Sequence, residues 1–135
     1  MGQNVLYQVR FRSGGYMAMY DNTHDKAVVL CASSAYEEKY YFNQEFAGLP
    51  KSVKEELQVM CVLYTADIGG ILTLQFDDNG KLFINVTSKE NDFLFDEIGS
   101  VLKIKQIQSE KIELLEALEL YYRIKFLNGD INNPG

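Results

Sequence analysis

The sequence predicts a single α+β domain in which helices pack on an antiparallel sheet built from two hairpins. Two pairs of short apolar runs flank one amphipathic helix, and a longer amphipathic segment follows the second pair. This order, β-β-α-β-β-α, is typical of an antiparallel sheet with helices on one or both faces. A length of 135 residues and an apolar fraction of 47% are sufficient for one hydrophobic core without a metal or a disulfide.

The N-terminal segment is expected to lie outside this domain. Residues 5–11 alternate like a strand, yet Gly14 and Gly15 follow, and a single residue separates them from Met17. Two glycines just before a methionine are what a bacterial ribosome-binding site of the GGAGG type encodes when it is translated. We therefore hypothesise that the native protein starts at Met17 or Met19. The expected organisation has three parts: leader and linker over residues 1–26, the domain over residues 27–127, and a frayed tail over residues 128–135.

The first hairpin is expected within residues 27–43. The run AVVLCA, residues 27–32, is a short apolar segment bounded by polar residues, which indicates a buried strand. Ser33 and Ser34 are expected to open a turn. The segment EEKYYFN, residues 37–43, is rich in aromatic residues and predicts the partner strand.

The helix that follows has clear signals at both ends. Pro50 ends the preceding segment, and Ser52 with Glu55 forms the S-x-x-E pattern of a capping box. The helix should run to about Ala66 and end at Gly69-Gly70. One face carries apolar residues at helical spacing, namely Val53, Leu57, Met60 and Tyr64. Three further residues widen this stripe and predict a largely buried helix: Val59, Val62 and Leu63.

The apolar pattern of the second hairpin, residues 71–88, determines its register. A two-residue turn would place the apolar side chains on both faces of the sheet. A three-residue loop, residues 78–80 with Gly80 in the left-handed conformation, pairs Asp77 with Lys81 instead. We therefore predict three apolar pairs that share one face: Phe76 with Leu82, Leu74 with Ile84, and Leu72 with Val86.

The last segment is helical over residues 110–127, where good helix formers carry an apolar face. Residues 101–107 either continue this helix backwards or form an extra strand, and the helix is favoured. The strand would give the order β-β-α-β-β-β-α, which looks like that of roadblock and longin domains, dimeric interaction platforms. A continuous helix over residues 100–127 would be about 40 Å long. This length and its several apolar sides favour a homodimer or a protein partner.

No recognised catalytic, cofactor or metal motif occurs, and no cofactor is expected. His24, the single histidine, lies in the polar linker, where nothing holds it against a nucleophile. Cys31 and Cys61 lie in apolar runs and are interpreted as buried free thiols; a disulfide between them has no support in the sequence. Asp92 could serve with Asp96 and Glu97 as a general acid and base, but acidic residues at a helix start explain them better.

Charge and hydropathy exclude two classes of partner. The net charge is −6, which disfavours nucleic acid. No apolar run approaches the ~20 residues of a membrane span, and the N-terminus lacks the apolar core of a signal peptide. The sequence therefore predicts a cytoplasmic protein.

Clustered tyrosines are the candidate functional residues. Aromatic clusters suit protein interfaces, and core packing with hydrated hydroxyl groups is the alternative. The candidates are Tyr40, Tyr41, Tyr121 and Tyr122. The favoured function is a non-enzymatic interaction or regulatory module that self-associates. A small-ligand-binding domain is the alternative, and a hydrolase-type enzyme that uses clustered acids is less favoured.

Three segments carry a resemblance to known sequences: YEEKYYFN, LPKSVKEELQVMCVLYTADIGGILTLQFDDNGKLF and DEIGSVLKIKQIQSEKIELLEALELYYR. Over residues 27–127 the chain resembles a small family of uncharacterised proteins from clostridia and related Firmicutes, whose members lack the first sixteen residues. The resemblance implies a bacterial cytoplasmic protein. It carries no activity and no site residues.

Overall fold

The computed structural model describes residues 5–12, 16–18 and 27–127. In chain order the elements are β1 (Val5–Arg12), β2 (Tyr16–Ala18), β3 (Val28–Ser34), β4 (Lys39–Phe42), the 3-10 helix η1 (Gln44–Phe46), α1 (Lys51–Ile68), β5 (Ile71–Phe76), β6 (Leu82–Lys89), α2 (Glu97–Glu110) and α3 (Ile112–Phe126). The strands form one antiparallel sheet in the order β2-β1-β6-β5-β3-β4. The predicted α+β class is confirmed.

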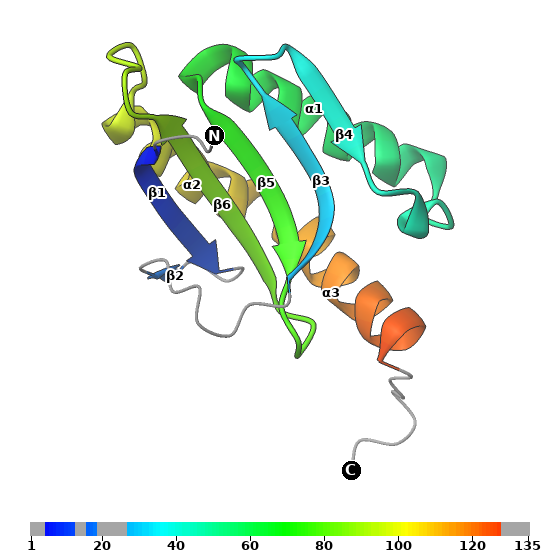
Figure 1. The fold of residues 1–135 in the computed structure, drawn as a ribbon. Helices are drawn as coiled ribbons and strands as arrows, with labels where there is room; N and C mark the ends of the chain where they lie inside the picture. Colours follow the sequence, from blue (N-terminus) through cyan, green and yellow to red (C-terminus); the bar gives the residue numbers. More distant parts are fainter. Residues whose placement is uncertain (1–4, 13–15, 19–26, 128–135) are drawn as a thin grey trace.

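The three α-helices cover one face of the sheet (Figure 1). The hairpin β5–β6 supplies the centre of the core with the predicted register, and the six apolar side chains of the predicted pairs are at most 1% exposed. Its pairs are Phe76 with Leu82, Leu74 with Ile84, and Leu72 with Val86. The three-residue loop is also confirmed, because the Asp77 N–H donates to the Lys81 carbonyl at 3.0 Å and Gly80 has φ +81°.

The first hairpin forms as predicted, but its turn lies further along the chain. Ser33 and Ser34 belong to β3 and pair with β4 on one side and β5 on the other. Pairing on both sides keeps them extended, and the Ser33 hydroxyl lies 2.8 Å from that of Thr65 in α1. The turn follows instead over residues 35–38, where Glu38 has φ +54°.

The predicted capping box of α1 is wrong. The helix begins at Lys51 with Pro50 as its N-cap, and no side chain caps it. The fixed φ of Pro50 starts the helix two residues earlier than Ser52, and the Pro50 carbonyl accepts from the N–H groups of Val53 and Lys54 at 3.0 Å. The predicted helix end is confirmed, since Gly69 has φ +94°.

The outer side of α1 is more exposed than expected. Leu57, Met60 and Tyr64 are buried as predicted, but three apolar residues that were expected to be buried are not: Val59 is 56% exposed, Val62 39% and Leu63 60%. The physical reason is the layer arrangement. Helices cover the sheet in a single layer, so each keeps one side that the sheet cannot reach.

Residues 101–107 lie in α2, so the favoured helix is confirmed and the roadblock or longin order is not adopted. The single helix over residues 100–127 is wrong, however, because the chain turns at Lys111 (φ −112°, ψ 24°). The Lys111 ammonium forms a 2.9 Å ion pair with Glu56 of α1. The break allows both Ile104 of α2 and Leu115 of α3 to reach the core. Helix length therefore gives no support for a dimer.

Strand β1 lies beside β6, with Phe11 opposite Ile84 and 1% exposed. The strand-like alternation of residues 5–11 thus corresponds to a strand of the sheet. The hypothesis that translation starts at Met17 or Met19 stays a prediction. The polar linker with His24 and the tail over residues 128–135 lie outside the described residues.

Candidate functional site

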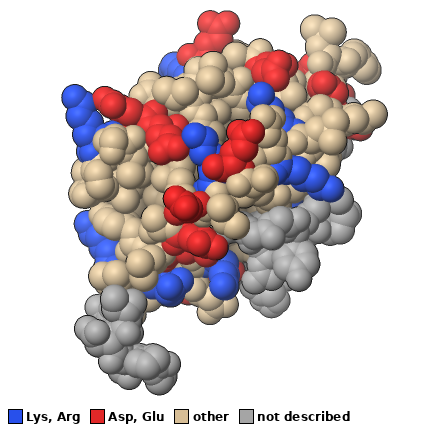
Figure 2. All heavy atoms as spheres, turned by 180° about the vertical axis from the view of Figure 1, so that it is seen from behind, with Lys and Arg blue, Asp and Glu red and all other residues tan. Residues whose placement is uncertain are grey.

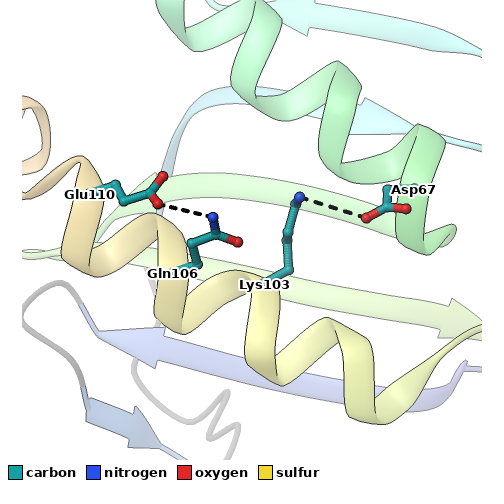
Figure 3. A network of polar contacts seen from close by, with 4 residues as sticks. All are labelled: Asp67, Lys103, Gln106 and Glu110. Atoms are coloured by element: carbon teal, nitrogen blue, oxygen red, sulfur yellow. Dashed lines mark hydrogen bonds and ion pairs between the residues drawn. The ribbon is translucent and has the colours of Figure 1, made fainter.

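The outer surface of α1 and α2 is the main candidate site. The two helices lie side by side and run antiparallel, as two ion pairs at opposite ends show. Lys111 pairs with Glu56 near the start of α1, and Lys103 pairs with Asp67 near its end, at 3.7 Å. Figure 3 shows the second pair bridging the two helices.

A groove of about 470 Å³ lies between these helices. Its apolar lining comes from both: Val59, Met60 and Leu63 of α1, and Ile107 of α2. Its charged lining has both signs: Glu55, Glu56, Glu110, Lys103 and Lys111. On the surface around it, acidic and basic side chains are interspersed (Figure 2). The groove is therefore an apolar hollow with a mixed charged rim.

One side of α2 provides the polar border of the groove. Lys103, Gln106 and Glu110 follow one another at spacings of three and four residues, which places them on one helical face. The Gln106 amide donates to the Glu110 carboxylate at 3.0 Å, as Figure 3 shows. These contacts fix the border while leaving the apolar lining open.

Four apolar side chains on and before α2 are exposed to an unusual degree. Ile98 and Leu102 are 76% and 64% exposed on the helix. Phe93 and Leu94, in the loop between β6 and α2, are 89% and 92% exposed. Single exposed apolar residues are common, but four of them within residues 93–102 favour an interaction surface.

The loop that carries Phe93 and Leu94 is held by several polar contacts. The Tyr36 hydroxyl donates to the Asp92 carboxylate at 2.6 Å and accepts from the Lys89 N–H at 3.1 Å. Burial, and then the hydrogen bond to Asp92, raise the pKa of Tyr36. At the other end Asp96 caps α2 by accepting from the Gly99 N–H at 2.8 Å. The two apolar side chains are thus presented to solvent by an anchored loop, which we call the Phe93–Leu94 protrusion.

The positions of Asp92, Asp96 and Glu97 in the loop before α2 and at the start of that helix are explained by structural roles. Asp92 also accepts from the Leu94 N–H at 3.0 Å, and Asp96 is the N-cap of α2 with Glu97 in the first turn. Over the described part of the chain, no group of three or more histidine, cysteine, aspartate or glutamate side chains is placed to hold a metal ion. No helix in that part is long and apolar enough to cross a membrane.

The four candidate tyrosines do not form one surface. Tyr40 and Tyr41 are consecutive in β4 and face opposite sides of the sheet; Tyr41 is 54% exposed. Tyr122 of α3 is 6% exposed, and its ring centroid lies 4.4 Å from that of Phe76. Tyr121 is half-buried beside it. Their assignment to an interface stays a prediction.

A family model described as a family of unknown function, DUF6145, matches residues 27–130. The chain belongs to this family. The DUF6145 region begins one residue before β3 and so contains α1, α2 and the groove between them. No curated protein and no solved structure matches the chain.

Sequence reasoning missed the groove, although one signal was present. The run from Val59 to Leu63 is apolar around almost the whole helix. Such a run indicates either a fully buried helix or a helix with two apolar contacts, one inside the domain and one outside. Because α1 has an exposed apolar side, it is a helix of the second kind, with one apolar contact inside the domain and one outside.

Proposed function

We propose that this protein is a non-enzymatic interaction module that associates with a second copy of itself through the α1–α2 face. The observation that carries the proposal is that α1 and α2 line an apolar groove, and that exposed apolar side chains lie on α2 and in the loop before it. A two-fold dimer uses the same patch on both subunits, so the patch must complement itself. A hollow and a projection of matching apolar character meet that requirement.

The spacing of these features supports a two-fold arrangement. The groove lining on α1 runs from Ser52 to Leu63, whereas the loop before α2 reaches the other end of α1, where the Phe95 ring lies close to Gly70. Leu63, at the end of the groove lining, and Leu102 of α2 are both exposed. An axis passing near these two leucines would set each protrusion against the groove of the other copy.

The rim charges favour a second copy over a strongly charged partner. The groove lining includes three glutamates and two lysines, so neither sign dominates. A two-fold axis can place lysine opposite glutamate at such a rim, which contributes to orientation more than to affinity. The proposal extends to a bacterial, cytoplasmic setting without nucleic acid or membrane as partner, in keeping with the net charge of −6.

Sedimentation velocity over a concentration series tests the proposal. Wild type should show a monomer–dimer equilibrium, and Leu63→Glu should weaken it at least about tenfold, because a charge would be buried without a partner. The matched control is Gln58→Glu, which adds the same charge to an exposed position of α1 away from the groove lining. A wild type that stays monomeric at its highest soluble concentration would refute the proposal, as would equal weakening by both variants.

A second groove favours small-ligand binding as the alternative function. It has a volume of about 580 Å³ between α1 and the β3–β4 hairpin, and its lining includes the paired hydroxyl groups of Ser33 and Thr65. Convergent polar groups in a hollow of this size suit a small molecule. Native mass spectrometry of the protein purified from its own host tests this candidate. A retained small molecule that Thr65→Val releases would support it, and an unliganded mass would count against it.

A further inference from the structure

Two cysteines that are distant in sequence meet in the core. Cys31 of β3 and Cys61 of α1 are both 0% exposed, both are free thiols, and their Sγ atoms lie 3.9 Å apart. We propose that they form a reversible redox pair, in which oxidation by a low-molecular-weight disulfide links β3 to α1. Nothing in the spacing of the two residues indicates this pairing, because the packing of α1 on the sheet creates it.

The geometry is close to that of a disulfide without being one. A disulfide needs an S–S distance of about 2.05 Å, so each sulfur must move by roughly 1 Å from its present place. Rotation of the two side chains and a small approach of α1 toward β3 can supply this. The cross-link would join the strand and the helix that also meet through the 2.8 Å contact between Ser33 and Thr65.

The second groove lies next to the two cysteines, although neither of them lines it. Its lining includes Ser33, two residues after Cys31, and Val62, which directly follows Cys61. Tyr40 also lines it, and its buried hydroxyl group has no hydrogen-bond partner. Displacement of Tyr40 would open a path from this groove toward the pair for a small disulfide.

The surroundings make the Cys61 thiol slow to react. The contact with Cys31, and then burial, raise the pKa of the Cys61 thiol well above its ordinary value. Burial, and then the neighbouring Cys31, raise the pKa of the Tyr40 hydroxyl. The thiolate is the reactive form of cysteine. The Cys61 thiol and the Tyr40 hydroxyl are therefore protonated at neutral pH, so Cys61 reacts slowly with a disulfide.

The reaction with oxidised glutathione balances as two exchanges. One cysteine loses its proton and attacks the disulfide, which forms a mixed disulfide and releases one glutathione thiolate. The second cysteine then loses its proton and attacks the protein sulfur of that mixed disulfide, which forms the Cys31–Cys61 bond and releases the second glutathione. The two cysteines lose two electrons and two protons, and the oxidant gains both. An excess of a small dithiol reverses the sequence.

The test uses the full-length wild-type protein and oxidised glutathione in native buffer. After an acid quench, the protein is unfolded, alkylated with N-ethylmaleimide and weighed by intact mass spectrometry. We expect the form with two adducts to be replaced by a monomeric form with none, and dithiothreitol to restore the first. Cys31→Ala and Cys61→Ala should each retain one thiol, free or bound to glutathione, and neither should form an internal link.

Three outcomes would overturn the proposal. In the first, the native protein keeps both thiols while the same oxidant links them in urea, which would make the pair only a packing contact. In the second, glutathione adducts accumulate on the wild type without an internal bond. In the third, the disulfide forms between two chains. Because each outcome is read on the wild type, the conclusion does not depend on the folding of a variant.

Discussion

Phe46 lies between the sheet and α3, and it is 0% exposed although it belongs to the short helix η1. Its ring centroid is 5.1 Å from that of Phe126 and 5.7 Å from that of Phe76, and both contacts hold α3 against the sheet. Phe46→Ala removes these contacts and leaves a cavity. We expect the free energy of unfolding to fall by about 3–5 kcal/mol, the usual cost for a buried phenylalanine.

Urea unfolding followed by circular dichroism measures this change, at one concentration at which the wild type sediments as a monomer. The urea concentration at the midpoint should fall, while the slope of the unfolding free energy with urea concentration stays constant. The matched control is Phe93→Ala, because Phe93 is 89% exposed and its removal should change stability by less than about 0.5 kcal/mol. A loss below about 1.5 kcal/mol for Phe46→Ala, or equal losses for both variants, would refute the packing argument.

Two further predictions concern the turn and the helix starts. Gly80 has φ +81°, a left-handed conformation that asparagine tolerates and valine does not. Gly80→Asn should therefore cost less stability than Gly80→Val. A larger loss for asparagine in urea unfolding would contradict this. Asp96→Ala should lower the free energy of unfolding by about 1 kcal/mol, because it removes the bond to the Gly99 N–H, whereas Ser52→Ala should leave it within about 0.5 kcal/mol. A larger effect at Ser52 would restore the capping box.

The predictions from sequence succeeded where short-range chemistry dominates. The register of β5–β6 follows from alternation and from Gly80, because a slip by one residue would move Leu72, Leu74 and Phe76 to the wrong face. The end of α1 follows from Gly69, the one residue type that adopts φ +94° without strain. In both places the information lies within a few residues, so the pattern alone is sufficient.

The predictions failed where a second element decides. The capping box at Ser52 is chemically sound, but Pro50 had already started the helix. The sequence around Lys111 contains no signal for a helix end. The break is explained by the ion pair with Glu56 and by the core positions of Ile104 and Leu115, which exist only once α1 lies beside α2. Local preferences are weak next to tertiary packing at such positions.

The sequence by itself therefore determined the α+β class, the two hairpins, the register of the second and the helical state of residues 101–107, because periodicity and turn chemistry are local. The tertiary structure alone decided which side of α1 is left without a partner, and it brought Cys31 within 3.9 Å of Cys61. Both depend on the single helical layer that covers one face of the sheet. The proposed interaction face and the proposed redox pair arise from that layer, the first on its outer side and the second beneath it.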